Sequence, residues 1–390
     1  MFIKGVKFKE KERILSYALA HAKPLAQKEA YLGSAAAPFV GRFGYPHVNV
    51  GIMAPPQHEE KAWEYDAPRY WAQQNATIQQ VVSYRTAMIN SRFVSNVKKP
   101  DKLVELAQEV AMSEKTVDID VTLAKKPNVN ITTDQWVAPM GPQARLKRLS
   151  LASNPRIPTK VQKFYDDTDA LASEALTTLY SKGIDENSLS RMLSVGIFGK
   201  QRKLVPTRWS ITATDDILGK NVLEEVKQQP TWEHRAYFGS YLGNYYLFLM
   251  FPENWTYELF EIYAKPGPAL EYSTDNEEFE GRKTYAENCA GGYYTPRLAI
   301  AEHLKENKRQ ASVLALRFIT DDYVLPLGVW VTREASRKAL ANKPIHFASK
   351  ELMLTYAVNI AKKKFGLDIK PLLQKSKLLK EKQKRLSAFS

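Results

Sequence analysis

Cysteine is nearly absent from this chain of 390 residues, and the one that occurs is Cys289. A single cysteine cannot form an internal disulfide, and it excludes every zinc module that needs two or more cysteine ligands. The six histidines are scattered, with no pair at the spacing of metal ligands. The sequence shows no base that would activate Cys289, so we expect a small buried residue there and no bound metal.

Long apolar runs and nucleotide-binding signatures are also missing. No stretch is apolar enough for a membrane-spanning helix, and charged residues interrupt the N-terminus, so we expect a cytoplasmic protein without membrane contact. Residues 41–44 (Gly-Arg-Phe-Gly) lack the Lys-Ser/Thr ending of a P-loop and the spacing of a dinucleotide fingerprint. No Gly-x-Ser-x-Gly motif occurs either. We therefore expect no cofactor.

Aromatic residues and positive charge are abundant. Aromatic residues make up 11% of the chain, which is enough to build a large core, and the formal net charge is +14. Residues 361–390 hold ten Lys or Arg against Asp368 and Glu381, so the tail is strongly basic and the body only mildly so. A basic balance of this kind favours a polyanionic partner such as DNA or RNA.

Periodicity predicts uneven blocks of helices and strands. Before the chain midpoint we expect helices over 8–31 and 168–181, a strand-turn-strand over 39–53 and a strand over 117–123. The tripeptide Leu242-Gly243-Asn244 predicts a hairpin, and a further strand follows over 258–263. An acidic, Pro- and Gly-bearing segment over 265–284 then predicts a domain boundary.

The part after this boundary is expected to contain helices over 285–307 and 333–341 and strands over 312–320 and 323–331. Ser349 is a suitable N-cap for a last helix that stops at Gly366. The pattern as a whole predicts an α+β fold. We expect a two-domain mixed α/β protein with antiparallel strands in the middle of the chain and a basic, flexible C-terminal tail.

The C-terminal end carries a short motif. Gln383, Leu386 and Phe389 stand three residues apart, so one 3₁₀-like turn would let the last two enter one apolar pocket while the amide reaches its rim. This pattern resembles the PCNA-interacting peptide, which binds the DNA sliding clamp, although Ser390 stands where the second aromatic is usual. A similar run over 143–149 lacks the aromatic residue. The alternative is a frayed helical end whose Leu386 and Phe389 pack back on the body.

Four longer segments resemble the archaeal Nre DNA-repair protein family. They cover residues 39–51 (FVGRFGYPHVNVG), 204–216 (LVPTRWSITATDD), 290–299 (AGGYYTPRLA) and 326–330 (PLGVW). The resemblance implies an Nre N-terminal region over 1–264, an Nre C-terminal region over 280–366, and a basic tail with the clamp-binding peptide over 367–390. It also implies a role in DNA damage repair, with other repair proteins as further partners. Many members carry a cysteine-rich N-terminal zinc module that this chain lacks, so no function of that module is carried over.

Several basic residues are candidate nucleic-acid contacts. Backbone N–H groups of the 41–44 loop and the guanidinium of Arg42 suit a phosphate, as does Arg208, but a plain tight turn is the alternative for the loop. A basic cluster near Pro142 is either a DNA contact or a solvated loop, and it comprises Arg145, Lys147 and Arg148. Gly291 and Gly292 precede Tyr293 and Tyr294, which could stack on bases or belong to the core.

Two adjacent carboxylates raise an enzymatic alternative. Asp215 and Asp216 could hold Mg²⁺ at a loop end, with Glu258 and Glu261 on a later strand completing a nuclease inventory. The other interpretation is an N-cap for a helix that starts at Ile217. The function we predict is a DNA-repair factor that binds DNA and is recruited to the sliding clamp. A metal-dependent nuclease and an RNA-binding protein with a basic tail are the alternatives.

Overall fold

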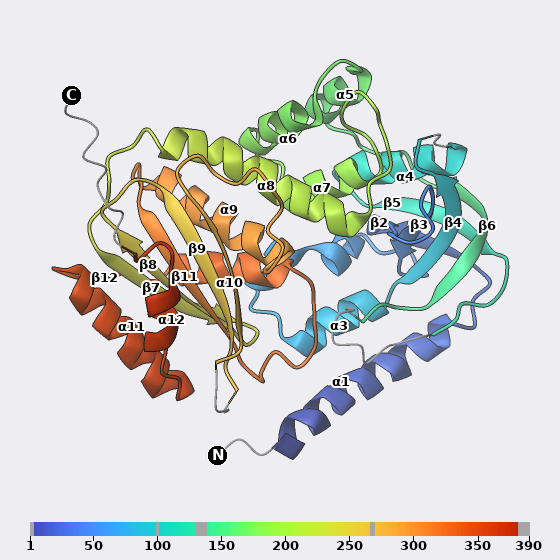
Figure 1. Ribbon diagram of the computed structural model, residues 1–390. Coiled ribbons are helices and arrows are strands. Elements are labelled where there is room, and N and C mark those ends of the chain that lie inside the picture. Colours follow the sequence, from blue (N-terminus) through green and yellow to red (C-terminus); the bar gives the residue numbers. More distant parts are fainter. Residues whose placement is uncertain (1–3, 99–100, 130–138, 266–269, 381–390) are drawn as a thin grey trace. The chain divides into compact units, whose positions relative to one another are not determined.

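The computed structural model describes residues 4–98, 101–129, 139–265 and 270–380, with side chains from residue 9 onward. The chain forms two compact units. Unit 1 comprises Met1–Leu218 with Val324–Trp330, and unit 2 comprises Gly219–Tyr323 with Val331–Ser390. The predicted α+β class and two-part organisation are confirmed (Figure 1).

Unit 1 is built on a six-stranded sheet with the order β1-β5-β6-β4-β3-β2. Within this sheet, the only parallel pair among the described strands is β4 with β6. The strands are β1 (Ala30–Ala35), β2 (Ala37–Val40), β3 (His47–Ala54), β4 (Ile89–Asn96), β5 (Val117–Leu123) and β6 (Gln143–Leu151). The helices are α1 (Lys4–Leu25), η1 (Ala62–Asp66), α2 (Pro68–Gln73), α3 (Ile78–Thr86), α4 (Lys102–Met112), α5 (Thr159–Asp166), α6 (Ala172–Ser181), α7 (Glu186–Ser194) and the start of α8 (Thr207–Val226).

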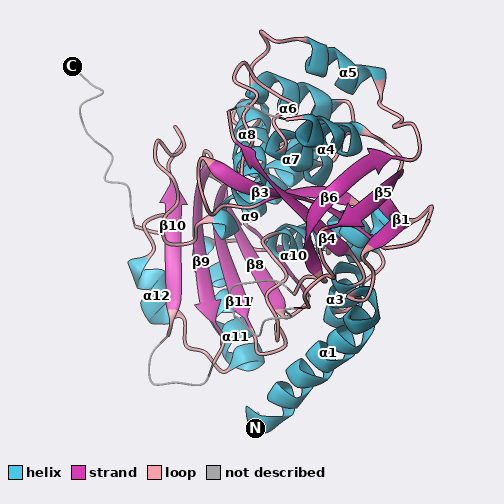
Figure 2. Cartoon of the chain, turned by 90° about the vertical axis from the view of Figure 1, so that its right-hand side faces the viewer, coloured by secondary structure: helices cyan, strands magenta, loops and turns pink. Residues whose placement is uncertain are grey.

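One face of this sheet is apolar and packs against helices, and the other carries the more exposed side chains and is called the open face below. Strand β5 alternates as predicted, with Val117, Ile119 and Val121 buried and the residues between them partly or fully exposed. Helices α4 and α7 pack on the apolar side, where they contact β2, and α4 also contacts β6. Figure 2 shows β5 and β6 in front of these helices, with the opposite side of the sheet facing the viewer.

Unit 2 is also built on a six-stranded sheet, with the order β10-β9-β11-β8-β7-β12. Its strands are β7 (Arg235–Tyr241), β8 (Asn244–Phe251), β9 (Thr256–Tyr263), β10 (Tyr272–Glu277), β11 (Ser312–Ile319) and β12 (Ile345–His346). Its helices are α9 (Gly291–Glu306), α10 (Trp330–Leu340), α11 (Lys350–Phe365) and α12 (Lys370–Lys375), with the end of α8. Helices α11 and α12 lie on one side of the sheet in Figure 1, and α9 and α10 lie on the other.

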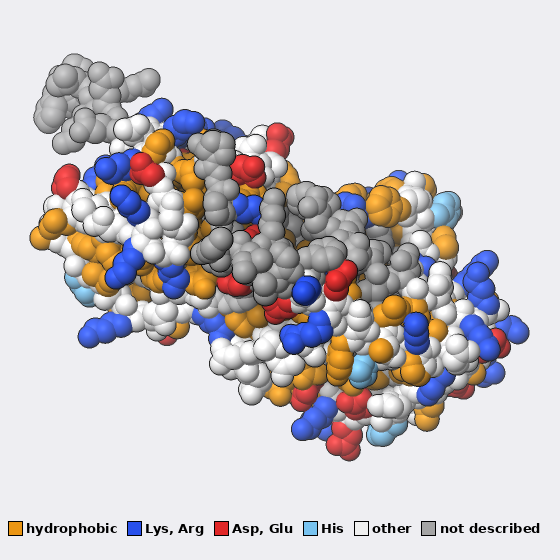
Figure 3. Space-filling view, turned by 90° about the horizontal axis from the view of Figure 1, so that it is seen from below, with side chains coloured by type: hydrophobic (Ala, Val, Ile, Leu, Met, Phe, Trp, Pro, Cys, Tyr) orange, Lys and Arg blue, Asp and Glu red, His pale blue; other side chains and the backbone are white. Residues whose placement is uncertain are grey.

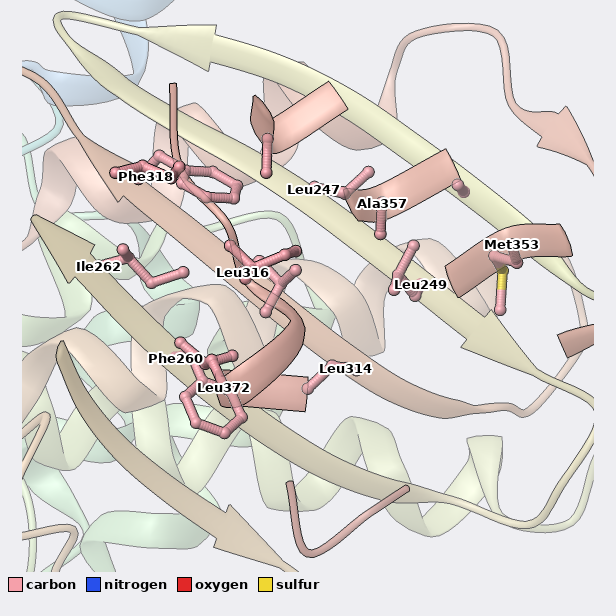
Figure 4. Packing of buried hydrophobic residues seen from close by; sticks show 14 of the residues in the cluster. Leu247, Leu249, Phe260, Ile262, Leu314, Leu316, Phe318, Met353, Ala357 and Leu372 are labelled. Atoms are coloured by element: carbon pink, nitrogen blue, oxygen red, sulfur yellow. The ribbon is translucent and has the colours of Figure 1, made fainter. Parts of the chain in front are cut away.

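Both faces of the unit 2 sheet are buried, because helices cover each of them. Leu247, Leu249 and Leu316 point toward Met353 and Ala357 of α11 in a single apolar cluster (Figure 4). On the other face, Tyr257 donates its hydroxyl to the carbonyl of Tyr293 in α9. Strands covered on both sides read as continuous apolar runs rather than as alternating ones, as residues 245–251 do.

Local signals predicted several elements correctly. The hairpin forms at Leu242 and Gly243, which have the positive φ angles of 47° and 75° that such a turn needs. The hydroxyl of Ser349 caps α11 by accepting from Leu352 N, and Gly366 ends the helix with a left-handed φ of 72°. The predicted strand over 323–331 is wrong. Pro326 has no N–H to donate to a strand, and Gly328 has a φ of 102°, so α10 begins at Trp330 instead.

The segment 265–284, which was expected to be a domain boundary, contains strand β10 of the unit 2 sheet. Strand β10 pairs with the preceding strand β9 in antiparallel fashion, with Tyr272 paired to Ile262, so the chain stays within one sheet across the start of this segment. The compact units separate elsewhere, between Leu218 and Gly219 and around Val324–Trp330.

Candidate nucleic-acid interface

The loop of residues 41–46 joins β2 to β3 and is held by its own backbone. Gly41 N donates to the carbonyl of Asn49 at 2.7 Å, and His47 N donates to the carbonyl of Gly44 at 2.8 Å. Gly44 has a φ of +87°, a conformation that costs other residues free energy. The predicted strand-turn-strand is therefore confirmed, and its turn is a fixed structure that can present side chains.

The side chains on this loop point into solvent. Phe43 is 73% exposed and Tyr45 is 54% exposed, although both are large and apolar. The guanidinium carbon of Arg42 lies 4.7 Å from the centre of the Phe43 ring, within the range of a cation–π contact. The loop therefore displays two aromatic rings together with a guanidinium.

Both ends of the loop are fastened to the segment that leads into α8. At one end, Val40 N donates to the hydroxyl of Thr207 at 2.8 Å. At the other, Val97 N donates to the carbonyl of Pro46 at 2.9 Å, and Leu204 N donates to the carbonyl of Val97 at 3.0 Å. Two of the family-like segments, far apart in sequence, therefore meet in unit 1.

The first turn of α8 adds a second pair of exposed side chains. Arg208 and Trp209 follow Thr207 directly, and Trp209 is 52% exposed. The first turn holds no acidic residue. The structure thus brings together the regions of Arg42 and Arg208, which were predicted separately. The sequence did not single out Phe43, Tyr45 and Trp209, although Phe43 and Trp209 each stand directly beside a predicted arginine.

Strand β6 places the predicted basic cluster on the open face of the sheet. Arg145, Lys147 and Arg148 are exposed. Consecutive residues on a strand normally face opposite ways, but the register between β5 and β6 shifts at Thr122/Leu123. This β-bulge explains why Lys147 and Arg148 can both reach solvent. These residues lie in a strand, not in the solvated loop that was the alternative.

A fourth basic residue, Arg92 of β4, lies beside this cluster. Arg92 is the register partner of Arg145 across the parallel pair, so both side chains leave the same face of the sheet. Burial lowers the pKa of the Arg92 guanidinium. Neither arginine has an ion pair with a carboxylate in the described part of the chain. Two neighbouring like charges that lack a counter-ion among the described residues favour the binding of an anion.

The basic surface ends at β5. Asp118 accepts a hydrogen bond from the hydroxyl of Ser34 and lies 3.0 Å from the imidazole of His58, so its charge is engaged. Asp120, the next outward residue on β5, is exposed. Figure 3 shows Lys and Arg side chains gathered along the right-hand edge of unit 1, the side on which β6 lies in Figure 1.

The predicted position of the aspartate pair at a loop end is wrong. Asp215 and Asp216 lie inside α8, which begins ten residues before Ile217 at Thr207, directly after Pro206. The run of Ser and Thr over 210–214 disguises the helix, because such residues are weak helix formers. Asp215 is 1% exposed and Asp216 is half-buried. Adjacent residues of a helix point about 100° apart, so the pair does not offer a shared metal site.

The two glutamates that the nuclease alternative would need, Glu258 and Glu261, form hydrogen bonds or ion pairs within the protein. Glu258 accepts hydrogen bonds from the C-terminal segment, and Glu261 is paired with Arg317. Within the residues that the structure describes, no three His, Cys, Asp or Glu side chains form a group able to hold a metal ion. No geometry in that part of the chain therefore favours the nuclease alternative.

The glycine pair of the third family-like segment lies at the start of α9, but the aromatic residues that follow it belong to the core. Tyr293 and Tyr294 are buried, so they are not able to stack on a base. Cys289 is buried as expected, and its N–H donates to Asp275 at 2.7 Å. Burial raises the pKa of the Cys289 thiol well above its usual range, which opposes a nucleophilic role.

The first part of the basic tail is folded. Leu367, Ile369 and Leu372 are buried against the sheet of unit 2, so the prediction of a flexible tail is wrong for this part. Their apolar side chains join the cluster beneath α11, which offsets the entropy lost on ordering. The clamp-motif residues Gln383, Leu386 and Phe389 lie outside the described residues. The similar run over 143–149 forms β6, so it is not available as a docking peptide.

The fold and surface define a two-unit α+β protein whose first unit exposes basic and aromatic side chains. The chain belongs to the archaeal Nre family. Residues 12–268 match the family described as Archaeal Nre, N-terminal, and residues 277–389 match Archaeal Nre, C-terminal. The N-terminal match therefore covers β7, β8 and β9 of the unit 2 sheet, and the C-terminal match covers β11 and β12. Among the described residues, no helix has the length and apolar character to cross a membrane.

Three relatives are named DNA repair proteins. The chain is 36% identical over 353 residues to NreB of Archaeoglobus fulgidus, covering 89% of this chain and 88% of the relative. It is 36% identical over 325 residues to NreA of Haloferax volcanii, covering 79% and 77%. It is 37% identical over 333 residues to NreA of Archaeoglobus fulgidus, covering 82% of each. No solved structure matches the chain.

Proposed function

We propose that this protein is a DNA-repair factor that binds DNA through unit 1 and is recruited to the sliding clamp through Gln383, Leu386 and Phe389. Family membership and the names of three relatives support the repair role. DNA repair in an archaeal cell takes place in the cytoplasm, which is where we place the protein. DNA and the clamp are the partners of this account, and other repair proteins are further ones.

The observation that carries DNA binding is the pairing of Arg92 with Arg145 on the open sheet face. A half-buried guanidinium beside a second one is electrostatically unfavourable without an anion. Phosphate oxygens satisfy both guanidinium groups, and Arg148 and Lys147 extend the same surface along β6. These contacts are made to the phosphate backbone, so they position the protein on DNA without reading its sequence.

Clamp recruitment rests on the spacing of the three tail residues and on where the tail leaves the body. Lys380 is the last described residue, and Gln383 follows three positions later. The docking peptide therefore begins close to a fixed point on unit 2. A peptide tied to a folded body in this way holds the DNA-binding unit near the DNA that passes through the clamp.

The test of DNA binding is a salt titration with labelled duplex DNA, comparing wild type with Arg145→Ala/Arg148→Ala. Each lost phosphate contact reduces the slope of log K against log salt by about 0.9, so we expect a reduction of about 2. Arg156→Ala is the control, because Arg156 is exposed but already paired with Glu114 at 2.7 Å. An unchanged slope in the double variant would contradict DNA binding by Arg145 and Arg148.

A further inference from the structure

Three large aromatic side chains of the 41–46 loop and of the first turn of α8 are mostly exposed. Phe43, Tyr45 and Trp209 leave 73%, 54% and 52% of their surfaces in solvent. Single exposed aromatics are ordinary, but rings on two segments that are hydrogen-bonded together mark a binding surface. The bonds of Val40 to Thr207 and of Val97 to Pro46 and Leu204 fix both segments.

The charges around these rings indicate what they bind. Arg42 and Arg208 are exposed beside them, residues 41–47 contain no carboxylate, and the first turn of α8 contains none either. A surface of rings and guanidinium groups without acidic residues suits an anionic ligand with planar groups. Nucleic acid has both, since its phosphates bind arginine and its bases stack on aromatic rings.

The state of the bases follows from the geometry of stacking. In a duplex, the faces of the bases are covered by neighbouring pairs, so a side chain reaches only their edges. Phe43 has no polar side-chain group that could read a base edge, so its ring can contribute only by stacking on an unstacked base. The ligand is therefore a strand whose bases are unpaired where it passes this surface.

We propose that Phe43, Tyr45 and Trp209 stack on unpaired bases of single-stranded DNA, while Arg42 and Arg208 contact its phosphates. This inference rests on the proposed function and names the DNA structure that the protein recognises. The arginines of β4 and β6 lie on the sheet to which β3 leads from the loop, and they hold the phosphate backbone of adjoining DNA. Together, the two surfaces suit a junction between duplex and single strand.

The experiment compares binding to a labelled single-stranded oligothymidine and to a duplex of the same length, using the full-length protein. We expect Phe43→Ala/Tyr45→Ala and Trp209→Ala to weaken single-strand binding by about five- to a hundredfold, and duplex binding by less than about twofold. Trp209→Phe keeps a ring and restores most of the affinity. Trp63→Ala, which removes a tryptophan that is 42% exposed on η1, is the matched control and leaves both affinities unchanged.

Each contrary outcome has a distinct meaning. Wild-type affinity of the aromatic variants for the oligothymidine overturns the inference, and so does an equal loss on both probes. Tighter binding of single-stranded RNA than of the same DNA overturns the assignment to DNA and favours the RNA-binding alternative. If the wild type binds duplex but not single strand, the inference fails and the proposed function stands. If it binds neither, DNA binding itself is contradicted.

Discussion

The buried carboxylate of Glu258 accepts a hydrogen bond from the hydroxyl of Ser376, on the segment that follows α12. It also accepts from the backbone N–H groups of Lys377 and Leu378, each at 3.0 Å. The side chains of Glu258 and Ser376 are at most 1% exposed. One glutamate of β9 therefore fixes the chain four residues before its last described position.

Replacing Glu258 by Ala leaves the buried hydroxyl of Ser376 and two partly buried backbone N–H groups without their acceptor. We expect the free energy of unfolding to fall by about 3 kcal/mol, because an unsatisfied buried donor costs about 1–3 kcal/mol. The C-terminal segment should also become sensitive to trypsin at Lys377 and Lys380. Urea unfolding and timed proteolysis measure the two effects. Glu253→Ala changes an exposed glutamate in the connection that leads into β9 and should alter neither.

His303 links stability to pH. Burial first, and then the charge of Arg235, lower the pKa of His303 from 6.5 to about 4. The unfolded chain binds a proton on this residue between pH 6.5 and pH 4 and the folded chain does not. The stabilising contribution of the neutral imidazole is therefore present above pH 6.5 and is lost as the pH falls toward 4.

The comparison of wild type with His303→Gln isolates this effect from the carboxylates that titrate in the same range. We expect the difference in free energy of unfolding between the two proteins to shrink by about 2 kcal/mol between pH 7 and pH 4. Urea unfolding at several pH values provides the measurement. A difference that stays constant with pH would show that His303 binds protons equally in both states.

Ala290 holds a backbone conformation that suits glycine. It precedes α9 with φ and ψ of 47° and −130°, and it is followed by Gly291. Relief of this strain outweighs the extra entropy that glycine brings to the unfolded chain, so Ala290→Gly should stabilise the protein by about 1 kcal/mol. Ala299→Gly, inside α9, should destabilise it by a similar amount. A loss of stability in Ala290→Gly would contradict the strain.

The aspartate pair should not support metal-dependent cleavage. Because Asp215 is buried inside α8, we expect Asp215→Asn to lower the melting temperature, while Asp216→Asn changes it little. Neither variant should alter the amount of DNA cut in the presence of Mg²⁺. Mg²⁺-dependent turnover of DNA by the wild type that disappears in both variants, with the fold intact by circular dichroism, would restore the nuclease alternative.

Local chemistry made part of this structure predictable. Ser349 and Gly366 bound α11 as expected, because caps depend on neighbouring residues alone. The buried face of β5 followed from simple alternation. The strand expected over 323–331 failed because apolar residues around Pro326 and Gly328 serve tertiary packing without strand geometry.

The candidate interface was predictable only in fragments. Arg42 and Arg208 were each identified within a distinctive segment, but the hydrogen bond from Val40 to Thr207 spans 167 positions and has no local signal. Arg92 also lacks a local signal, because it joins the proposed interface only through its register with Arg145 on another strand. Long-range pairing of this kind emerges from the packed sheet and not from the periodicity of any one strand.

The most direct test of the account is calorimetric binding of the full-length protein to a purified archaeal sliding clamp, beside a variant lacking residues 383–390. We predict a micromolar or tighter complex, about −8 kcal/mol or better, that the deletion abolishes. Ala substitutions at Leu386 and Phe389 alone should have the same effect, because these side chains are expected to fill the apolar pocket. Equal binding of the full-length and deleted proteins, or no binding by either, would contradict clamp recruitment.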